Sequence, residues 1–174
     1  MDLDRRTPLI SAALLAFLGG GARMTYGQVP PTGGTDCSLV TPAMLNKTFG
    51  QPMTGKPEVE KALPMYGGAS GWHCTYSVGN PTQRVKVEFS VYTEASAAKA
   101  RQDFNTYSVA ADVARGKPSI GDGAYWVEPT KKTLALYVLK GKVHFSLQAH
   151  FSQEVGPANE KQLSELAAAV AAGI

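Results

Sequence analysis

Strict alternation of apolar and polar residues marks the clearest strand of the chain, at residues 84–92. Valine and phenylalanine at 85, 87, 89 and 91 face one way, and charged or small polar residues at 84, 86, 88 and 90 face the other. Residues 143–151 alternate in the same manner. A strand with one apolar and one polar face is typical of an antiparallel sheet that buries one side. We therefore predict such a sheet at the centre of the fold.

Three further segments, 72–78, 124–128 and 133–139, are rich in the β-branched and aromatic residues that favour strands. The turn Gly79-Asn80-Pro81-Thr82 separates the first of them from the strand at 84–92. Lys140-Gly141 joins the last two strands of the chain in a short hairpin. The predicted sheet therefore has about five strands.

Three segments have the signals of helices. Thr41-Pro42 opens the first helix and Gly50 ends it, because threonine caps a helix, proline suits its first turn and glycine stops it. The second helix follows Thr93-Glu94 and has a thin apolar stripe. The third begins near Pro157 and repeats apolar residues at helical spacing. The segment 57–63 is interpreted as one more helical turn.

The predicted order of these elements is α-β-β-α-β-β-β-α. Strands joined by hairpins, with helices between and after them, indicate an α+β fold. We expect the helices to pack on one face of a five-stranded, largely antiparallel sheet and to leave the other face open.

The N-terminal segment predicts export. An uncharged apolar run at 8–18 follows Arg5-Arg6 and precedes small residues, as in a signal peptide. The run is shorter than the roughly 20 residues that a membrane-spanning helix needs. We interpret residues 1–27 as a signal peptide, 28–36 as a flexible leader and 37–174 as a single domain, which predicts a periplasmic or secreted protein with no stable transmembrane span after cleavage.

The chain has two cysteines, Cys37 and Cys74. In an exported protein an isolated pair predicts a disulfide, and the Cys-x-x-Cys spacing of redox motifs is absent. Here the bridge would tie the first helix to the first strand. Lipidation of Cys37 is not expected, because this cysteine lies far beyond the apolar run and follows Thr35-Asp36.

Composition narrows the functional classes. The chain is 44% apolar and 18% charged, which is typical of a globular protein. The net charge is +3 and the lysines are scattered, whereas nucleic-acid binding needs a basic stripe with interleaved aromatic residues. We therefore expect no nucleic-acid partner.

No residue pattern predicts catalysis, a cofactor or a metal. Ser70 lies in the glycine-rich segment 67–71, which lacks the spacing of a nucleophile elbow or a phosphate loop. Asp122 lies in a Gly-Asp-Gly turn without a neighbouring histidine or carboxylate. His144 and His150 share one strand face but lie about 20 Å apart, too far to share a metal; His73 lies on another strand.

Four aromatic residues remain as a candidate ligand patch: Trp72, Tyr76, Tyr125 and Trp126. They are either core residues or, if they lie on the open face of the sheet, a surface for a ligand or partner.

The segments Cys37-Ser38-Leu39-Val40-Thr41-Pro42, Phe49-Gly50, Cys74-Thr75-Tyr76 and Ile120-Gly121-Asp122-Gly123-Ala124-Tyr125-Trp126 resemble a group of small exported bacterial proteins. These are described as uncharacterised lipoproteins or domains of unknown function, and the resemblance covers roughly residues 37–151. It implies a pairing of the two cysteines. Many members carry a lipid on a separate cysteine, which this sequence does not contain. The element order also resembles the Mog1/PsbP-like fold, and neither resemblance implies an activity.

The sequence thus predicts an exported, non-catalytic binding module whose open sheet face contacts an envelope protein or a small ligand. One alternative is an envelope hydrolase that uses Ser70, Asp122 or a histidine. Another is a protease inhibitor that presents the loop 67–71.

Overall fold

The fold is seen in a computed structural model that describes residues 36–62, 69–110 and 114–174. These residues belong to one unit, Pro31–Ile174. The predicted signal peptide (1–27) and all but Asp36 of the predicted leader lie outside the described residues. Part of the predicted glycine-rich loop does so too.

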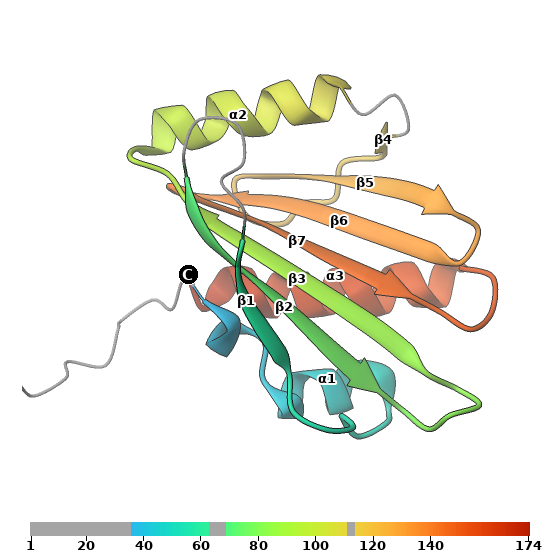
Figure 1. The fold of residues 1–174 in the computed structure, drawn as a ribbon. Coiled ribbons are helices and arrows are strands. Elements are labelled where there is room, and N and C mark those ends of the chain that lie inside the picture. Colours follow the sequence, from blue (N-terminus) through green and yellow to red (C-terminus); the bar gives the residue numbers. More distant parts are fainter. Residues whose placement is uncertain (1–35, 63–68, 111–113) are drawn as a thin grey trace, which may run out of the picture. The chain divides into compact units, whose positions relative to one another are not determined.

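A seven-stranded sheet forms the centre of the fold (Figure 1). In chain order its strands are β1 Glu58–Ala62, β2 Ser70–Val78, β3 Val85–Thr93, β4 Ala114–Arg115, β5 Gly123–Thr130, β6 Thr133–Lys140 and β7 Val143–His150. Across the sheet the order is β1-β2-β3-β7-β6-β5-β4, and every neighbouring pair is antiparallel. The α+β class and the antiparallel sheet are confirmed.

The two strands that the sequence analysis missed are the edges of the sheet. β1 replaces the helical turn predicted at 57–63, and it pairs with β2 from Glu58↔Thr75 to Ala62↔Gly71. The residues of β1 are almost all exposed. Because neither face of this strand is buried, its sequence has no alternating apolar pattern from which a strand could be predicted. β4 has two residues, too few for any periodicity. The predicted count of five strands and the predicted order were therefore wrong at both edges.

The predicted helices are present, preceded by one 3-10 turn: η1 Cys37–Leu39, α1 Pro42–Phe49, α2 Ala97–Ala110 and α3 Pro157–Ala172. At the start of α1 the hydroxyl of Thr41 accepts a hydrogen bond from the backbone N–H of Met44 at 3.2 Å. Gly50 ends the helix with a φ of 67°, a backbone conformation that favours glycine.

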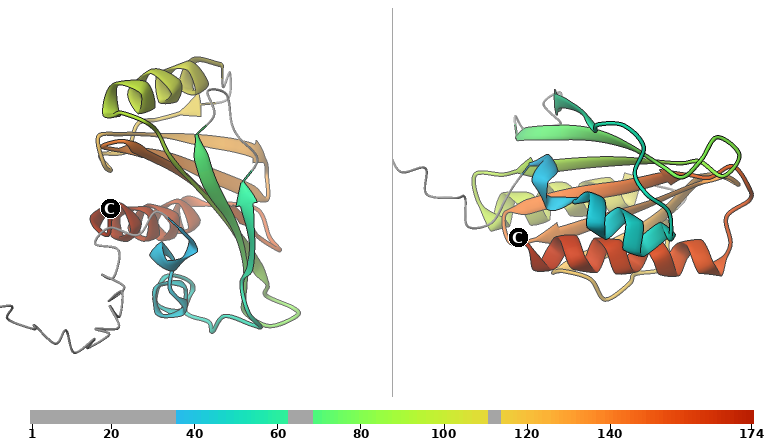
Figure 2. Two further views of the ribbon diagram at one scale, coloured as in Figure 1. Left: turned by 60° about the vertical axis from the view of Figure 1, so that its left-hand side comes forward. Right: turned by 90° about the horizontal axis from the view of Figure 1, so that it is seen from below.

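We call one face of the sheet the inner face. It packs against α1 and α3 to form the apolar core, which is mainly aliphatic. Figure 2 shows these two helices side by side beneath the strands. The buried residues that meet there include Leu45, Val87, Phe89, Leu136, Phe145, Leu147, Leu163, Leu166 and Val170. Strand alternation therefore directs the apolar residues of β3 and β7 inward, as predicted.

The predicted Cys37–Cys74 disulfide is confirmed, and it joins η1 to β2 beneath the inner face. The buried Tyr76 reinforces it, because its hydroxyl donates a hydrogen bond to the carbonyl oxygen of Cys37 at 2.8 Å. Burial, with a smaller contribution from the nearby charge of Asp36, raises the pKa of Tyr76 to about 12. The 3-10 turn η1 is thus attached to the sheet by a covalent bond and a buried hydrogen bond.

The expectation that all helices cover one face was wrong for α2. Phe104 of α2 lies 5.1 Å from Tyr125 between ring centroids, and Tyr107 lies 6.4 Å from His144. Both strand residues point away from the inner face. Figure 2 shows strands β5, β6 and β7 running between α2 and α3. We call the opposite face of the sheet the outer face. The apolar stripe of α2 is aromatic where it meets the sheet, and it packs on the aromatic rings of the outer face.

Candidate functional site

The outer face of the sheet is polar and aromatic. The backbone register aligns one residue from each of five strands in a row across this face: His73, Ser90, Ser146, Tyr137 and Tyr125. The neighbouring row places Tyr92 of β3 beside His144 of β7. Residues far apart in the sequence therefore meet on one surface.

Helix α2 encloses part of this surface and leaves a hollow of about 180 Å³, which we call the tyrosine pocket. Its six ring-bearing side chains on the outer side of the sheet are Tyr92, Phe104, Tyr107, Tyr125, Tyr137 and His144. Ser90, Ser146 and Gln148 add polar groups. Two of the rings come from α2 and the rest from β3, β5, β6 and β7, so docking of α2 completes the pocket.

The rings of the strands are ordered in two stacked pairs. Tyr125 and Tyr137 lie 5.0 Å apart with 2° between their planes, and Tyr92 and His144 lie 5.2 Å apart with 16° between theirs. The ring of Phe104 is tilted by 58° to that of Tyr125. Stacked and tilted pairs of this kind are favourable beyond their buried area. These ring contacts therefore hold the walls of the pocket in place.

Two glycines allow the aromatic rings to lie close to the strands. A Cβ at Gly71 would lie 2.5 Å from Cδ1 of Tyr92, and a Cβ at Gly123 would lie 3.3 Å from Cε1 of Phe104. Any larger residue at Gly71 would displace the Tyr92 ring. Two glycines that looked like turn residues in the sequence thus help to shape the tyrosine pocket.

A buried pair of polar residues supports the wall formed by His144. Its Nε2 lies 3.1 Å from Oε1 of Glu94, and the two residues are 8% and 5% exposed. The backbone of Glu94 is fixed as well, since its N–H donates to the carbonyl oxygen of Lys142 at 2.9 Å. Burying a carboxylate is costly unless it is paired. The pair therefore fixes the histidine ring that stacks on Tyr92.

The hydroxyls of Tyr92, Tyr125 and Tyr137 stay protonated at neutral pH. Burial raises the pKa of Tyr125 and of Tyr137, and for Tyr125 the neighbouring tyrosines add to the effect. Burial also raises the pKa of Tyr92, with smaller contributions from Tyr107 and Tyr137. The pocket therefore offers neutral phenol groups, which can donate and accept hydrogen bonds.

The four aromatic residues of the candidate patch do not lie together. Tyr125 lies in the tyrosine pocket, whereas Tyr76 is in the core and Trp72 and Trp126 pack against the core from its edge. Adjacent residues of a strand point to opposite faces, so Tyr125 and Trp126 cannot share a surface. One of the four residues thus contributes to the site.

The residues proposed for a hydrolase have partners other than one another. The carboxylate of Asp122 accepts a hydrogen bond from the N–H of Gly141 at 2.7 Å and lies 3.8 Å from Lys140, so it holds the β6–β7 turn. Ser70 is the first residue of β2 and pairs with Thr93. In the described part of the chain, neither Asp122 nor Ser70 hydrogen-bonds to a histidine.

The histidines have other partners. Nδ1 of His73 lies 2.8 Å from the hydroxyl of Ser90, and Nδ1 of His150 lies 3.2 Å from that of Thr133. Within the described ranges no group of three histidine, cysteine, aspartate or glutamate residues could hold a metal ion. Residues 67 and 68 of the predicted inhibitory loop lie outside the described residues.

Sequence reasoning missed Tyr92, Tyr137 and Glu94. A signal was present for Tyr92, because it is an aromatic residue at a polar position of an alternating strand. Tyr137 lies in a segment that is apolar on both faces, where periodicity carries no signal. The contact of Glu94 with His144 spans 50 residues, so only the folded chain reveals it.

No family model and no curated protein matches the chain. Among solved structures, it is similar to the crystal structure of the extracellular domain of PknH from Mycobacterium tuberculosis, with 14% identity and a TM-score of 0.47. That similarity covers 76% of this chain and 93% of the other. It is too distant to transfer any property of PknH. None of the described helices is long and apolar enough to span a membrane.

Proposed function

We propose that this chain is an exported, non-catalytic module that binds a small organic molecule in the tyrosine pocket. The observation that carries the proposal is the buried Glu94–His144 pair in the wall of a hollow lined by aromatic rings. A buried ion pair or polar pair contributes little net stability, and apolar residues of similar volume at the same positions often stabilise a fold equally well. Its presence beside a preformed hollow is best explained by ligand binding.

The lining of the pocket favours ligands without a negative charge. The described residues that line it include no lysine or arginine, and the carboxylate of Glu94 lies directly behind His144. Aromatic faces are electron-rich and attract cations. At about 180 Å³ the hollow is smaller than the roughly 300 Å³ at which sites for drug-sized ligands begin. One ring with a short neutral or cationic substituent suits this space.

Three ligands that share a phenyl ring with a one-carbon substituent test this charge preference: benzylamine, benzyl alcohol and benzoate. Each is titrated into the exported, disulfide-bonded chain and followed by NMR chemical shifts of Tyr92, Tyr137 and His144. For so few non-hydrogen atoms we expect a Kd of about 1 mM for benzylamine and benzyl alcohol, and at least about tenfold weaker binding of benzoate. Absence of any shift in these residues, or a preference for benzoate, would contradict the proposal.

A pair of variants separates the pocket from the rest of the outer face. Ser146→Phe fills the tyrosine pocket and is expected to abolish the shifts. Thr75→Phe adds the same side chain to the outer face of β2, outside the pocket lining, and should leave binding unchanged. Equal binding by both variants would place the ligand elsewhere.

Export is supported by the disulfide, because such bonds persist in oxidising compartments, and by the predicted signal peptide at 1–27. The test is expression of the full chain in a bacterial host, followed by fractionation and intact mass measurement. We expect an extracytoplasmic product that begins after Ala22 or Gly27 and whose mass increases by about two hydrogens on reduction. A full-length cytoplasmic product with free thiols is the opposite outcome.

A further inference from the structure

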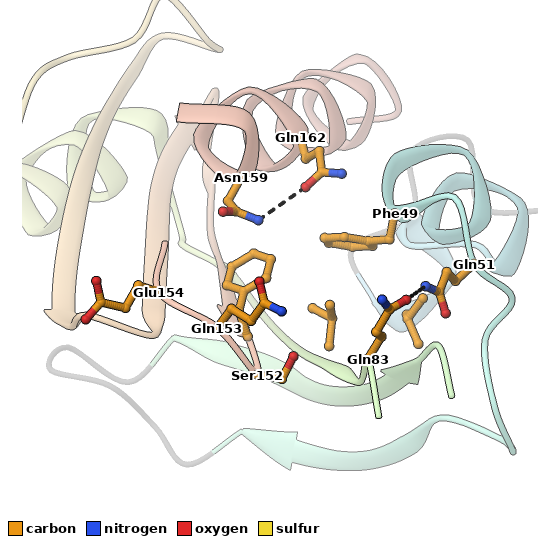
Figure 3. A pocket seen from close by; sticks show the side chains of 11 residues that line it. Phe49, Gln51, Gln83, Ser152, Gln153, Glu154, Asn159 and Gln162 are labelled. Atoms are coloured by element: carbon orange, nitrogen blue, oxygen red, sulfur yellow. Dashed lines mark hydrogen bonds between the residues drawn. The ribbon is translucent and has the colours of Figure 1, made fainter. Parts of the chain in front are cut away.

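A second hollow, of about 230 Å³, lies at the opposite side of the sheet from the tyrosine pocket, beside the apolar core. The end of α1, the turn between β2 and β3, the segment after β7 and the first turns of α3 surround it (Figure 3). Its polar lining consists mainly of five side-chain amides: Gln51, Gln83, Gln153, Asn159 and Gln162. We call it the amide pocket. Nothing in the proposed function uses it.

The amides face one another from two sides of the hollow. On one side Nε2 of Gln51 donates to Oε1 of Gln83 at 2.9 Å, and on the other Nδ2 of Asn159 donates to Oε1 of Gln162 at 3.5 Å (Figure 3). Each amide has two N–H donors and two acceptor lone pairs, so these contacts leave most of that capacity free. The hollow thus presents neutral donors and acceptors together.

The floor between the amides is apolar. Phe49 and Phe151 meet there edge to face, with 6.4 Å between centroids and 60° between planes, and Val78 and Val85 lie beside them. Both phenylalanines are half-buried, so their rings remain within reach of a ligand. The floor can therefore contact the C–H groups of a ligand whose polar groups bind the amides.

The amide pocket is nearly free of charge. Glu154 is the one ionisable residue among the described lining residues; it lies apart from the amides in Figure 3 and 3.6 Å from Lys131. Anions find no cationic partner in this lining. Neutral ligands therefore fit it best.

The β2–β3 turn is shaped to bring two of the amides together. Gly79 has a φ of 91°, and a Cβ there would lie 2.3 Å from the carbonyl oxygen of Gln83 and 2.8 Å from Oε1 of Gln51. Asn159 is fixed as well, since its Oδ1 accepts from the N–H of Gly156 at 2.9 Å. Fixed side chains reduce the entropy lost on binding.

From these features we propose that the amide pocket is a binding site for a neutral saccharide. The C–H groups of a sugar ring can lie against the aromatic rings of the floor. Its hydroxyl groups both donate and accept hydrogen bonds, as do the amides of the walls. An extended peptide is less well suited, because it binds by adding a strand at a sheet edge. The pocket lies at the ends of β2 and β3, and each of these strands is paired on both sides.

The test titrates methyl β-glucoside and N-acetylglucosamine into the exported, disulfide-bonded chain and follows the side-chain NH2 signals of the five glutamine and asparagine residues by NMR. N-acetyl-alanyl-alanine amide is the peptide probe. We expect the NH2 signals of Gln83 and Gln153 to shift with at least one sugar, with a Kd of about 1–10 mM. No shift with either sugar up to about 100 mM, or a shift with the peptide probe alone, would overturn the proposal.

Variants identify the groups responsible. Gln83→Ala removes an exposed amide and is expected to weaken sugar binding about tenfold, a typical effect of one lost hydrogen bond to a ligand. Phe151→Leu keeps an apolar side chain but removes the ring, and should weaken binding to a similar degree with the protein still folded by circular dichroism.

Gln102→Ala, an exposed glutamine on α2 outside the pocket, is the matched control and should bind as the unchanged chain does. Sugar binding that is insensitive to Gln83→Ala and Phe151→Leu contradicts the assignment. Benzylamine, benzyl alcohol and benzoate report on a different pocket, so failure of either proposal leaves the other intact.

Discussion

The two faces of the sheet are made by the same strands but differ in their side chains and in the helices that cover them. The inner face is apolar and mainly aliphatic, is covered by α1 and α3, and is secured by the Cys37–Cys74 disulfide. The outer face has tyrosines, serines and histidines, and α2 covers only part of it. Since neighbours in a strand point to opposite faces, a single residue step separates the two environments. We therefore expect the stability of this domain to reside mainly on the inner face, whereas the proposed tyrosine pocket lies on the outer face.

Removing the disulfide is expected to have the largest effect on stability, and it tests whether the two faces are independent. The disulfide closes a loop with a sequence separation of 37, for which the chain-entropy model gives a stabilisation of about 4 kcal/mol. We expect the double variant Cys37→Ala/Cys74→Ala to lose about that much free energy of unfolding in urea. In the fraction that remains folded, the signals of Tyr92 and His144 on the outer face should be unchanged. A shift of these signals would show that the two faces are coupled.

The next largest effect compares two neighbours in the central strand β7. Leu147 is fully buried on the inner face, and Leu147→Ala should cost about 3 kcal/mol through lost burial and the cavity left behind. Ser146 lies on the outer face, and Ser146→Ala should change stability by no more than about 0.5 kcal/mol. Urea unfolding with the disulfide intact measures both. Similar losses for the two variants would contradict the division between the faces.

A smaller effect is expected on the outer face itself, at the buried Glu94–His144 pair. Glu94→Gln keeps the size of the side chain and one hydrogen bond but removes the charge, and we expect a loss of about 1–2 kcal/mol. Binding of benzylamine should weaken more than that of benzyl alcohol, because the variant removes the negative charge behind His144. Equal weakening of both ligands would argue that Glu94 acts only through the position of the histidine.

The sequence predicted the interior of this fold better than its edges or its site. Alternation identified β3 and β7, and the signals of Thr41 and Gly50 placed α1, because burial on one face and helix capping leave local patterns. β1 was misread because an exposed edge strand has no buried face. The side on which α2 packs depends on its contacts with Tyr125 and His144, which are remote in sequence. The tyrosine pocket forms only when four strands pair in the correct register and α2 packs on them, so no local sequence pattern could predict it.

The smallest effect concerns Tyr76 and its dependence on pH. Its phenol has a pKa of about 12 in the folded chain, against about 10 in the unfolded chain. Because the unfolded chain loses this proton first, the stabilisation from Tyr76 is complete below pH 10 and is lost as the pH rises from about 10 to about 12. Tyr76→Phe should cost about 1 kcal/mol at neutral pH, through loss of the hydrogen bond to Cys37, and should flatten the decline above pH 10.

Tyr125→Phe is the outer-face counterpart of this variant. Burial raises the pKa of Tyr125 as well, so its removal should also reduce the alkaline decline, but it breaks no contact with the disulfide segment. Urea unfolding of the two variants and the unchanged chain at several pH values from 7 to about 12 separates these effects. If the free energy of unfolding of Tyr76→Phe declines with pH as steeply as that of the unchanged chain, ionisation of the outer-face tyrosines causes the loss of stability at high pH. The inner face would then not be the first to lose stability in alkali.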